Sequence, residues 1–150
     1  MSISTSWLID GRVLFVTSSS PQFDHKELQE LIQSLSHYVE LSASDSSLYF
    51  IHDLRTVQDR KQVVLYVNSL YPQLISISRQ VLVLSDTYWA LEKRLLRHAL
   101  KNYGEPAVVY SLDESFQYLQ QLDRSLPNLR AAFRARVRQL LQHPLESLPD

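Results

Sequence analysis

The chain has 150 residues, of which 45% are hydrophobic and 21% are charged, and its formal net charge is −1. This is the composition of an ordinary globular protein, and so small a net charge creates no global field for nucleic acid or acidic substrates. The absence of cysteine excludes disulfides, thiolate nucleophiles and thiolate-rich metal sites. No secretory signal pattern or apolar run of about 20 residues is present, so we expect a cytoplasmic protein without a transmembrane segment.

The first elements in the chain are a hairpin and a helix. Asp10-Gly11 separates the apolar stretches 7–9 and 13–16, which predicts a β-hairpin because both turn positions favour a positive φ. Asp24 then predicts the N-cap of a helix, with Glu27 in the capping-box position. The apolar face of that helix consists of Leu28, Leu31, Ile32, Leu35 and Val39. The serine-rich stretch 42–47 is expected to end it.

Strands and helices alternate in the middle of the chain. A strand at 48–51 ends in His52-Asp53. Residues 58–71 fit a strand by their β-branched content and a helix by their spacing, and we predict a helix because a parallel crossover needs one. A strand at 81–84 precedes Ser85-Asp86-Thr87, which predict a helix cap, and Gly104 marks the helix end. A strand at 107–110 leads into a predicted capping box of Ser111 and Glu114.

This order predicts an α/β fold with a small mixed sheet. An N-terminal antiparallel hairpin continues into parallel crossover strands, and helices cover the sheet. We predict one domain over residues 1–123, followed by an arginine-rich helix and tail over residues 124–150. Pro127 is predicted at the first position of that helix, and His143-Pro144 at its end.

Residue types exclude several chemistries. The chain has only two glycines, Gly11 and Gly104, so it cannot build a phosphate loop or a dinucleotide-binding turn. Its five histidines do not stand at the spacing of metal ligands. The sequence therefore predicts no catalytic residue, no cofactor and no metal site.

One candidate ligand site remains, at the carboxyl ends of the parallel strands, where α/β sheets bind ligands. It consists of Asp53, Arg55, Thr56 and Asp86. The two carboxylates could share a cation or a proton there. The simpler interpretation is that Asp86 caps a helix while Asp53 pairs with Arg55.

Three segments carry a family resemblance over residues 7–122. The hairpin with the capped first helix, the stretch 51–57 (IHDLRTV) and the stretch 108–116 (VVYSLDESF) resemble the anti-sigma-factor-antagonist (STAS) and SpoIIAA-like group. The resemblance implies a mostly non-enzymatic domain that binds protein partners. The phosphoacceptor motif of that group, Asp-Ser-x-Gly, is absent, because residues 58–62 read QDRKQ. Thr56 is a poor substitute for the missing serine.

The C-terminal helix carries an asymmetric charge. Residues 124–143 hold five arginines and no acidic residue, whereas the rest of the chain holds ten basic and sixteen acidic side chains. Arginines repeat every four residues beside an apolar face, and such like charges repel unless an outside surface compensates them. The candidate partner-binding residues are Arg130, Phe133, Arg134, Val137, Arg138 and Leu141.

The apolar face of this helix leaves two interpretations open: the helix packs on its own domain, or it binds a protein partner. The leading hypothesis is a non-enzymatic interaction or regulatory module that also self-associates as a homo-oligomer. The alternative is a small enzyme or ligand-binding domain that uses Asp53, Arg55 and Asp86. Nucleic acid or an anionic membrane is the minority interpretation of this helix, because glycine loops are lacking and the basic set is small, and we expect no nucleic-acid partner.

Overall fold

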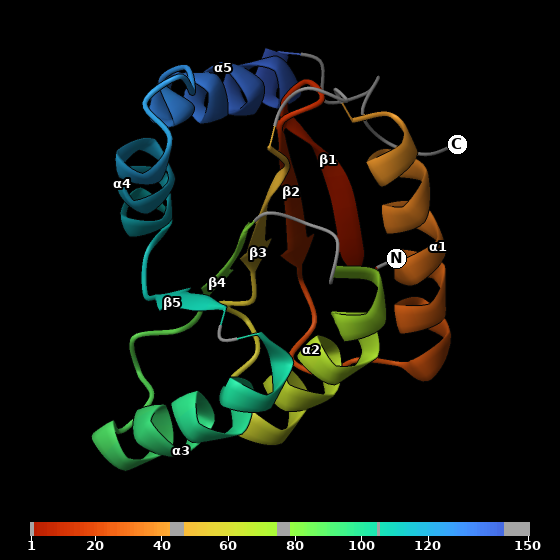
Figure 1. Ribbon diagram of the computed structural model, residues 1–150, viewed down its shortest axis with the longest axis vertical. Coiled ribbons are helices and arrows are strands. Elements are labelled where there is room, and N and C mark those ends of the chain that lie inside the picture. The colour runs from red at the N-terminus through yellow and green to blue at the C-terminus, as the bar shows by residue number, and fades with distance from the viewer. Residues whose placement is uncertain (1, 43–46, 75–78, 105, 143–150) are drawn as a thin grey trace.

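The computed structural model of the chain describes residues 2–42, 47–74, 79–104 and 106–142. They form a five-stranded sheet in which each strand lies beside the next one in the sequence (Figure 1). β1 (Ile3–Ile9) and β2 (Val13–Ser18) are antiparallel. β3 (Tyr49–Asp53), β4 (Arg79–Val83) and β5 (Ala107–Val109) continue parallel to β2. The predicted α/β class with a mixed sheet is confirmed.

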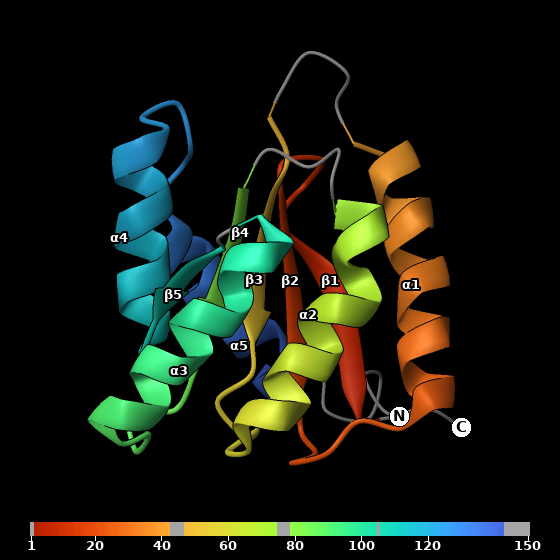
Figure 2. The same cartoon turned by 60° about the horizontal axis from the view of Figure 1, so that its bottom comes forward.

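Helices cover both faces of this sheet (Figures 1 and 2). α1 (His25–Glu40), α2 (Arg60–Leu74) and α3 (Ala90–Leu100) connect successive strands and lie on one face, because crossovers of one hand return the chain on the same side. A short 3-10 helix, η1 (Lys101–Tyr103), extends α3. α4 (Leu112–Leu122) and α5 (Leu129–Gln142) follow the last strand and pack on the opposite face.

The sheet therefore separates two apolar cores. In β3, Phe50 contributes to the core under α1, α2 and α3, whereas Tyr49 and Ile51 contribute to the core under α4 and α5. Every residue of this strand is buried. A strand that is covered on both faces reads as an almost continuous apolar run rather than as an alternating one.

The hairpin and the first helix form where the local sequence predicts them. Gly11 has a φ of 73°, and the N–H of Arg12 donates to the carbonyl of Ile9 at 3.0 Å, which closes the predicted hairpin. Asp24 is the N-cap of α1, and its Oδ1 accepts a hydrogen bond from the N–H of Lys26 at 3.3 Å. The predicted end of this helix falls partly on residues 43–46, which lie outside the described residues.

The ambiguous stretch 58–71 is a helix, as predicted. α2 buries Val63, Tyr66, Val67 and Leu70 against the sheet at helical spacing. Its first turn is capped by Asp59, whose Oδ1 accepts from the N–H of Lys61 at 2.9 Å. The β-branched residues are thus on a buried helix face, where tertiary packing outweighs their modest preference for strands.

Two predicted helix starts are wrong. Ser85, Asp86 and Thr87 do not cap α3, which begins at Ala90, because the hydroxyls of Ser85 and Thr87 bond to each other at 2.7 Å in a separate turn. Pro127 does not begin α5 either. Asn128 caps that helix, and its Oδ1 accepts from the N–H of Ala131 at 2.9 Å.

The three remaining predicted boundaries differ in outcome. Ser111 caps α4 as predicted, but Glu114 bonds the N–H of Tyr110 rather than that of Ser111, so the capping box is incomplete. Gly104 ends η1 with a φ of 80°, as a helix-terminating glycine does. His143-Pro144 lie outside the described residues.

Candidate functional site

The carboxyl edge of the sheet holds the first predicted site, and its acidic residue is already paired. Asp53 ends β3, and both of its oxygens accept from the Arg55 guanidinium, at 2.8 and 2.9 Å. The bond to Asp53 raises the pKa of Arg55. Asp53 is buried, and this bidentate bond leaves its carboxylate little capacity for a ligand.

The other two residues of this predicted site, Thr56 and Asp86, form no hydrogen bond with Asp53. Thr56 donates its hydroxyl proton to the carbonyl of Ser18 at 2.8 Å, which ties the loop after β3 to the end of β2. Asp86 is exposed in the turn after β4. No hydrogen bond or ion pair connects Asp86 with Asp53 or Arg55 in the described part of the chain.

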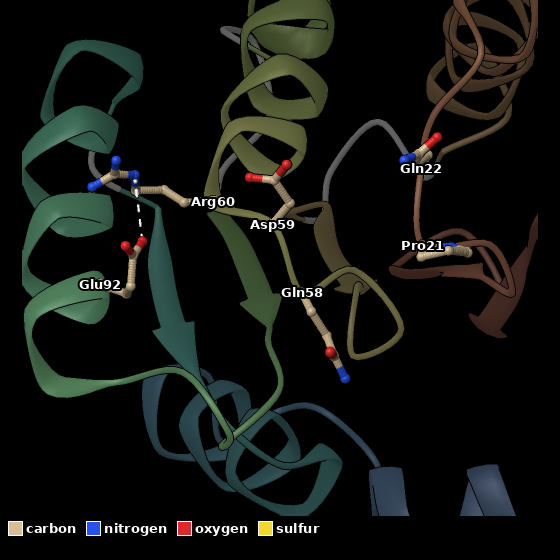
Figure 3. A pocket seen from close by; sticks show the side chains of 6 residues that line it. All are labelled: Pro21, Gln22, Gln58, Asp59, Arg60 and Glu92. Carbon is tan, nitrogen blue, oxygen red and sulfur yellow. Dashed lines mark ion pairs between the residues drawn. The ribbon is translucent and has the colours of Figure 1, made fainter.

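A hollow does open at this edge, but other residues line it (Figure 3). It has a volume of about 430 Å³ and is bounded by Pro21, Gln22, Gln58, Asp59, Arg60 and Glu92. Arg60 pairs with Glu92 across it at 3.5 Å, and Asp59 caps α2. The charges that line the hollow therefore already serve the fold. Within the described ranges, no group of three or more histidines and carboxylates could hold a metal ion.

The inner face of α5 belongs to the second core. Leu129 is fully buried, and the ring of Phe133 packs between Phe15 and Phe116 with centroid distances of 5.8 and 5.7 Å. Phe133 was predicted as a partner-binding residue, but this packing turns it towards the sheet. Leu129 and Phe133, in the first part of the apolar spacing, therefore dock the helix on its own domain.

The outer face of α5 is exposed and mixes arginines with apolar side chains. Arg134 and Arg138 are exposed and make no ion pair or hydrogen bond with any other residue that the structure describes. Val137, Leu140 and Leu141 are 38%, 53% and 75% exposed. We call these five residues the α5 outer face. Four of the six predicted partner-binding residues belong to this face: Arg134, Val137, Arg138 and Leu141.

The remaining arginines of α5 serve the fold. Arg130 pairs with Asp113 of α4 at 3.0 Å. Arg136 donates to the carbonyl of Trp7 on β1. Arg130 was predicted as a partner contact, and the structure gives it a partner inside the chain.

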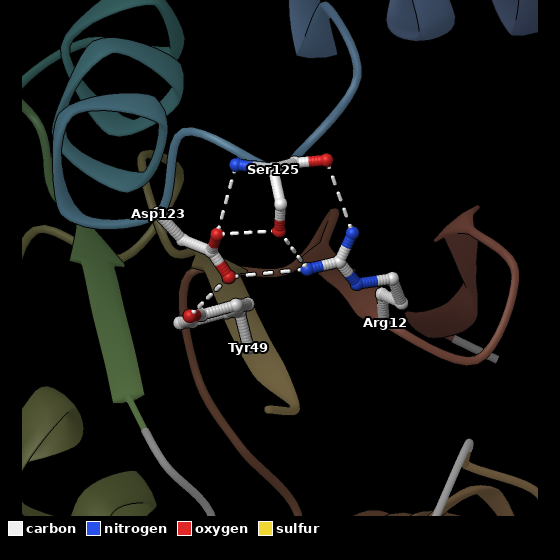
Figure 4. A network of polar contacts seen from close by, with 4 residues as sticks. All are labelled: Arg12, Tyr49, Asp123 and Ser125. Carbon is white, nitrogen blue, oxygen red and sulfur yellow. Dashed lines mark hydrogen bonds and ion pairs between the residues drawn. The ribbon is translucent and has the colours of Figure 1, made fainter. Parts of the chain in front are cut away.

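A polar network holds the connection between α4 and α5 on the hairpin (Figure 4). Asp123 accepts from Arg12 at 3.1 Å, from the Tyr49 hydroxyl at 2.7 Å and from the Ser125 hydroxyl at 2.6 Å. The bonds from Ser125 and Tyr49 lower the pKa of the Asp123 carboxyl, whereas burial and the bond to Asp123 raise the pKa of Tyr49. Sequence reasoning missed this network, because its members lie at opposite ends of the chain.

The free edge of β1 is capped by side chains from both helix layers. The Tyr38 hydroxyl of α1 donates to the carbonyl of Thr5 at 3.1 Å, and Arg136 of α5 donates to that of Trp7. An uncapped edge strand offers such groups to a strand from another molecule. Capping therefore disfavours association through sheet extension at β1.

A buried histidine forms a second polar cluster that the sequence did not reveal. His52 lies between the Tyr66 hydroxyl at Nδ1 and Gln80 Oε1 at Nε2, each at 2.6 Å. Burial lowers the pKa of His52 to about 4 and raises the pKa of Tyr66. A neutral ring that accepts from Tyr66 and donates to Gln80 satisfies both nitrogens, so His52 is a structural residue of the core.

Sequence reasoning also missed an exposed apolar surface on α3. Trp89, Leu91 and Leu95 are 80%, 60% and 40% exposed, although Leu96 and Leu100 of the same segment are buried. The available signal was a second apolar stripe: Leu91 and Leu95 are four residues apart, on a different side of the helix from Leu96 and Leu100.

Comparisons of the chain with protein-family models, with curated proteins and with solved structures found no match. The resemblance to the STAS and SpoIIAA-like group thus stays a prediction. Of the helices formed by the described residues, none has both the length and the apolar character needed to cross a bilayer.

Proposed function

We propose that this protein is a non-enzymatic interaction module that binds an acidic protein surface through the α5 outer face. The observation that carries the proposal is that Arg134 and Arg138 make no ion pair within the described structure, although they lie on the same helix as exposed Leu141. Repulsion between neighbouring arginines weakens a helix slightly, and an acidic partner would relieve it. Apolar contacts combined with arginine are also typical of protein interfaces.

Self-association is part of this proposal. Outside residues 124–143 the chain has sixteen acidic and ten basic side chains, so a second copy can offer a surface of the required charge. Two α5 outer faces would repel each other, so one copy should contact the body of the next rather than its α5. The capped edge of β1 disfavours the competing route through strand pairing.

The alternative, a small enzyme or ligand-binding domain at the carboxyl edge, has weaker support. It requires the carboxylates of Asp53 and Asp86 in one pocket, but neither lines the hollow of Figure 3. The carboxylate of Asp53 already forms an ion pair with Arg55. The resemblance to a mostly non-enzymatic family supports the interaction module as well.

The test compares two charge reversals of equal size. Arg134→Glu with Arg138→Glu alters the α5 outer face, and Arg94→Glu with Arg97→Glu alters exposed arginines of α3 as the matched control. Light scattering at increasing protein concentration should show association of the wild type and of the control. The α5 variant should stay monomeric, with an unchanged circular dichroism spectrum.

If the wild type is monomeric at every concentration, self-association is wrong. The same variants then serve as bait for partners from the native host. Equal capture by the α5 variant and the wild type would rule out the α5 outer face as the binding surface.

A further inference from the structure

The N-terminal part of α3 presents apolar side chains that the fold does not use. Leu96 and Leu100 already anchor the helix in the core, whereas Trp89, Leu91 and Leu95 face solvent. Trp89 also occupies the N-cap position, and its side chain makes no capping bond. Serine, threonine, aspartate or asparagine would stabilise the helix at that position, so local structure gives no reason for a tryptophan.

The exposed side of α3 is basic. Arg94, Arg97 and Lys101 are exposed along the helix and its extension. Glu92, the single acidic residue of α3, is partly buried and pairs with Arg60 of α2 at 3.5 Å. The surface therefore combines leucines, a tryptophan and cations, without an unpaired carboxylate on the helix.

The shape of this surface is a ridge rather than a groove. In both views α3 lies at a corner of the molecule, at the margin of the helix layer (Figures 1 and 2). The hollow beside it is lined by Trp89 and Tyr88 with polar residues, and neither Leu91 nor Leu95 contributes to it. A projecting ridge fits a planar, deformable apolar phase, which needs no matching pocket.

We propose that α3 docks this protein on the surface of an anionic lipid bilayer. Trp89, Leu91 and Leu95 would lie at the boundary between headgroups and acyl chains, where tryptophan is enriched and amphipathic helices bind in the plane of the membrane. Arg94 and Arg97 would face the lipid phosphates. The proposal concerns a different surface from the α5 outer face and does not depend on it.

The first experiment measures co-sedimentation of the full chain with lipid vesicles at low salt. The protein should bind vesicles of phosphatidylcholine and phosphatidylglycerol in equal parts, and not vesicles of phosphatidylcholine alone. Physiological salt should weaken binding, because it shortens the Debye length from about 30 Å to about 8 Å. Asp86, exposed in the turn before Trp89, opposes the attraction, so Asp86→Asn should strengthen binding.

Matched variants locate the binding surface. Removing one cation near an anionic leaflet should weaken binding about fivefold, so Arg94→Ala with Arg97→Ala should weaken it about twenty-five-fold. Arg134→Ala with Arg138→Ala removes the same charge from α5 and should have much less effect. In the same way, Leu91→Ser with Leu95→Ser should abolish binding, whereas Leu140→Ser with Leu141→Ser should not.

Tryptophan fluorescence gives a readout that is independent of charge. Trp7 packs against Tyr38 with ring centroids 5.3 Å apart, whereas Trp89 is free to enter the bilayer. Vesicles with brominated acyl chains should quench the emission of Trp89, and Trp89→Phe should remove the quenched component. The proposal is overturned by the absence of binding to anionic vesicles, by equal binding to neutral ones, or by equal losses in the α3 and α5 variants.

Discussion

Replacing Leu129 by alanine tests whether α5 is part of the domain or an appendage to it. Leu129 stands at the start of α5 and is fully buried in the core that α4 and α5 form with the sheet. Its side chain shares that core with Phe15 and Phe116. Truncation to alanine removes apolar contacts and leaves a cavity that rigid neighbours fill only in part.

The expected loss can be worked out from this burial. Truncating a fully buried leucine costs about 3 kcal/mol. With a urea m-value of about 2 kcal/mol/M for a domain of this size, the unfolding midpoint should fall by about 1.5 M. Circular dichroism and tryptophan fluorescence should report one shared transition, because α5 and the sheet unfold together.

Leu140→Ala is the matched control, because it makes the same chemical change in the same helix at an exposed position. It should alter stability by no more than about 0.5 kcal/mol. Equal shifts of the unfolding midpoint in both variants would contradict the burial of Leu129 in the core. An early transition in which Leu129→Ala melts α5 and leaves the rest at the wild-type midpoint would show that α5 is an appendage.

Two more predictions concern buried and capping groups. The pKa of His52 is lowered from 6.5 to about 4, so between these values the unfolded chain binds a proton that the folded chain does not. Stability should therefore fall by about 3 kcal/mol as the pH decreases through this window. Urea midpoints across it should show a flatter pH dependence for His52→Gln, and an equal slope would contradict the assignment. Asp24→Ala removes the acceptor for the Lys26 N–H and should cost about 1 kcal/mol, whereas Asp24→Ser should restore most of it. An unchanged urea midpoint for the alanine variant would mean that α1 does not depend on this cap.

The elements that sequence reasoning predicted well are those that neighbouring residues determine. Gly11 allows the hairpin turn, and Asp24 caps α1 within two residues of itself. Helical spacing correctly decided the ambiguous stretch that became α2. Local signals failed where two of them competed: Ser85 and Thr87 satisfied each other, so α3 began without a polar cap.

The candidate surfaces were harder to predict, because they depend on what lies opposite each helix. The spacing of α5 identified its arginine stripe. It could not show that Phe133 packs against Phe15 whereas Leu141 is exposed to solvent. The α3 surface was missed for the same reason, since leucines at helical spacing usually indicate burial.

Ion pairs were predictable only over short spans. Asp53 and Arg55 are two residues apart, so their pairing could be anticipated. The bond between Arg12 and Asp123 joins residues 111 positions apart, and no local pattern announces it.

The order of elements along the chain also determines how the protein is made. α1, α2 and α3 alternate with the strands, so one face of the sheet can be covered while the ribosome is still translating. The other face, with Phe15 and Ile51, must wait for residues 112–142, which follow all five strands. At about 5–20 residues per second, synthesis of that segment takes about 2–6 s. Until that segment is made and packed, this face of the sheet stays bare and apolar, so chaperones would have the most effect before α4 and α5 dock.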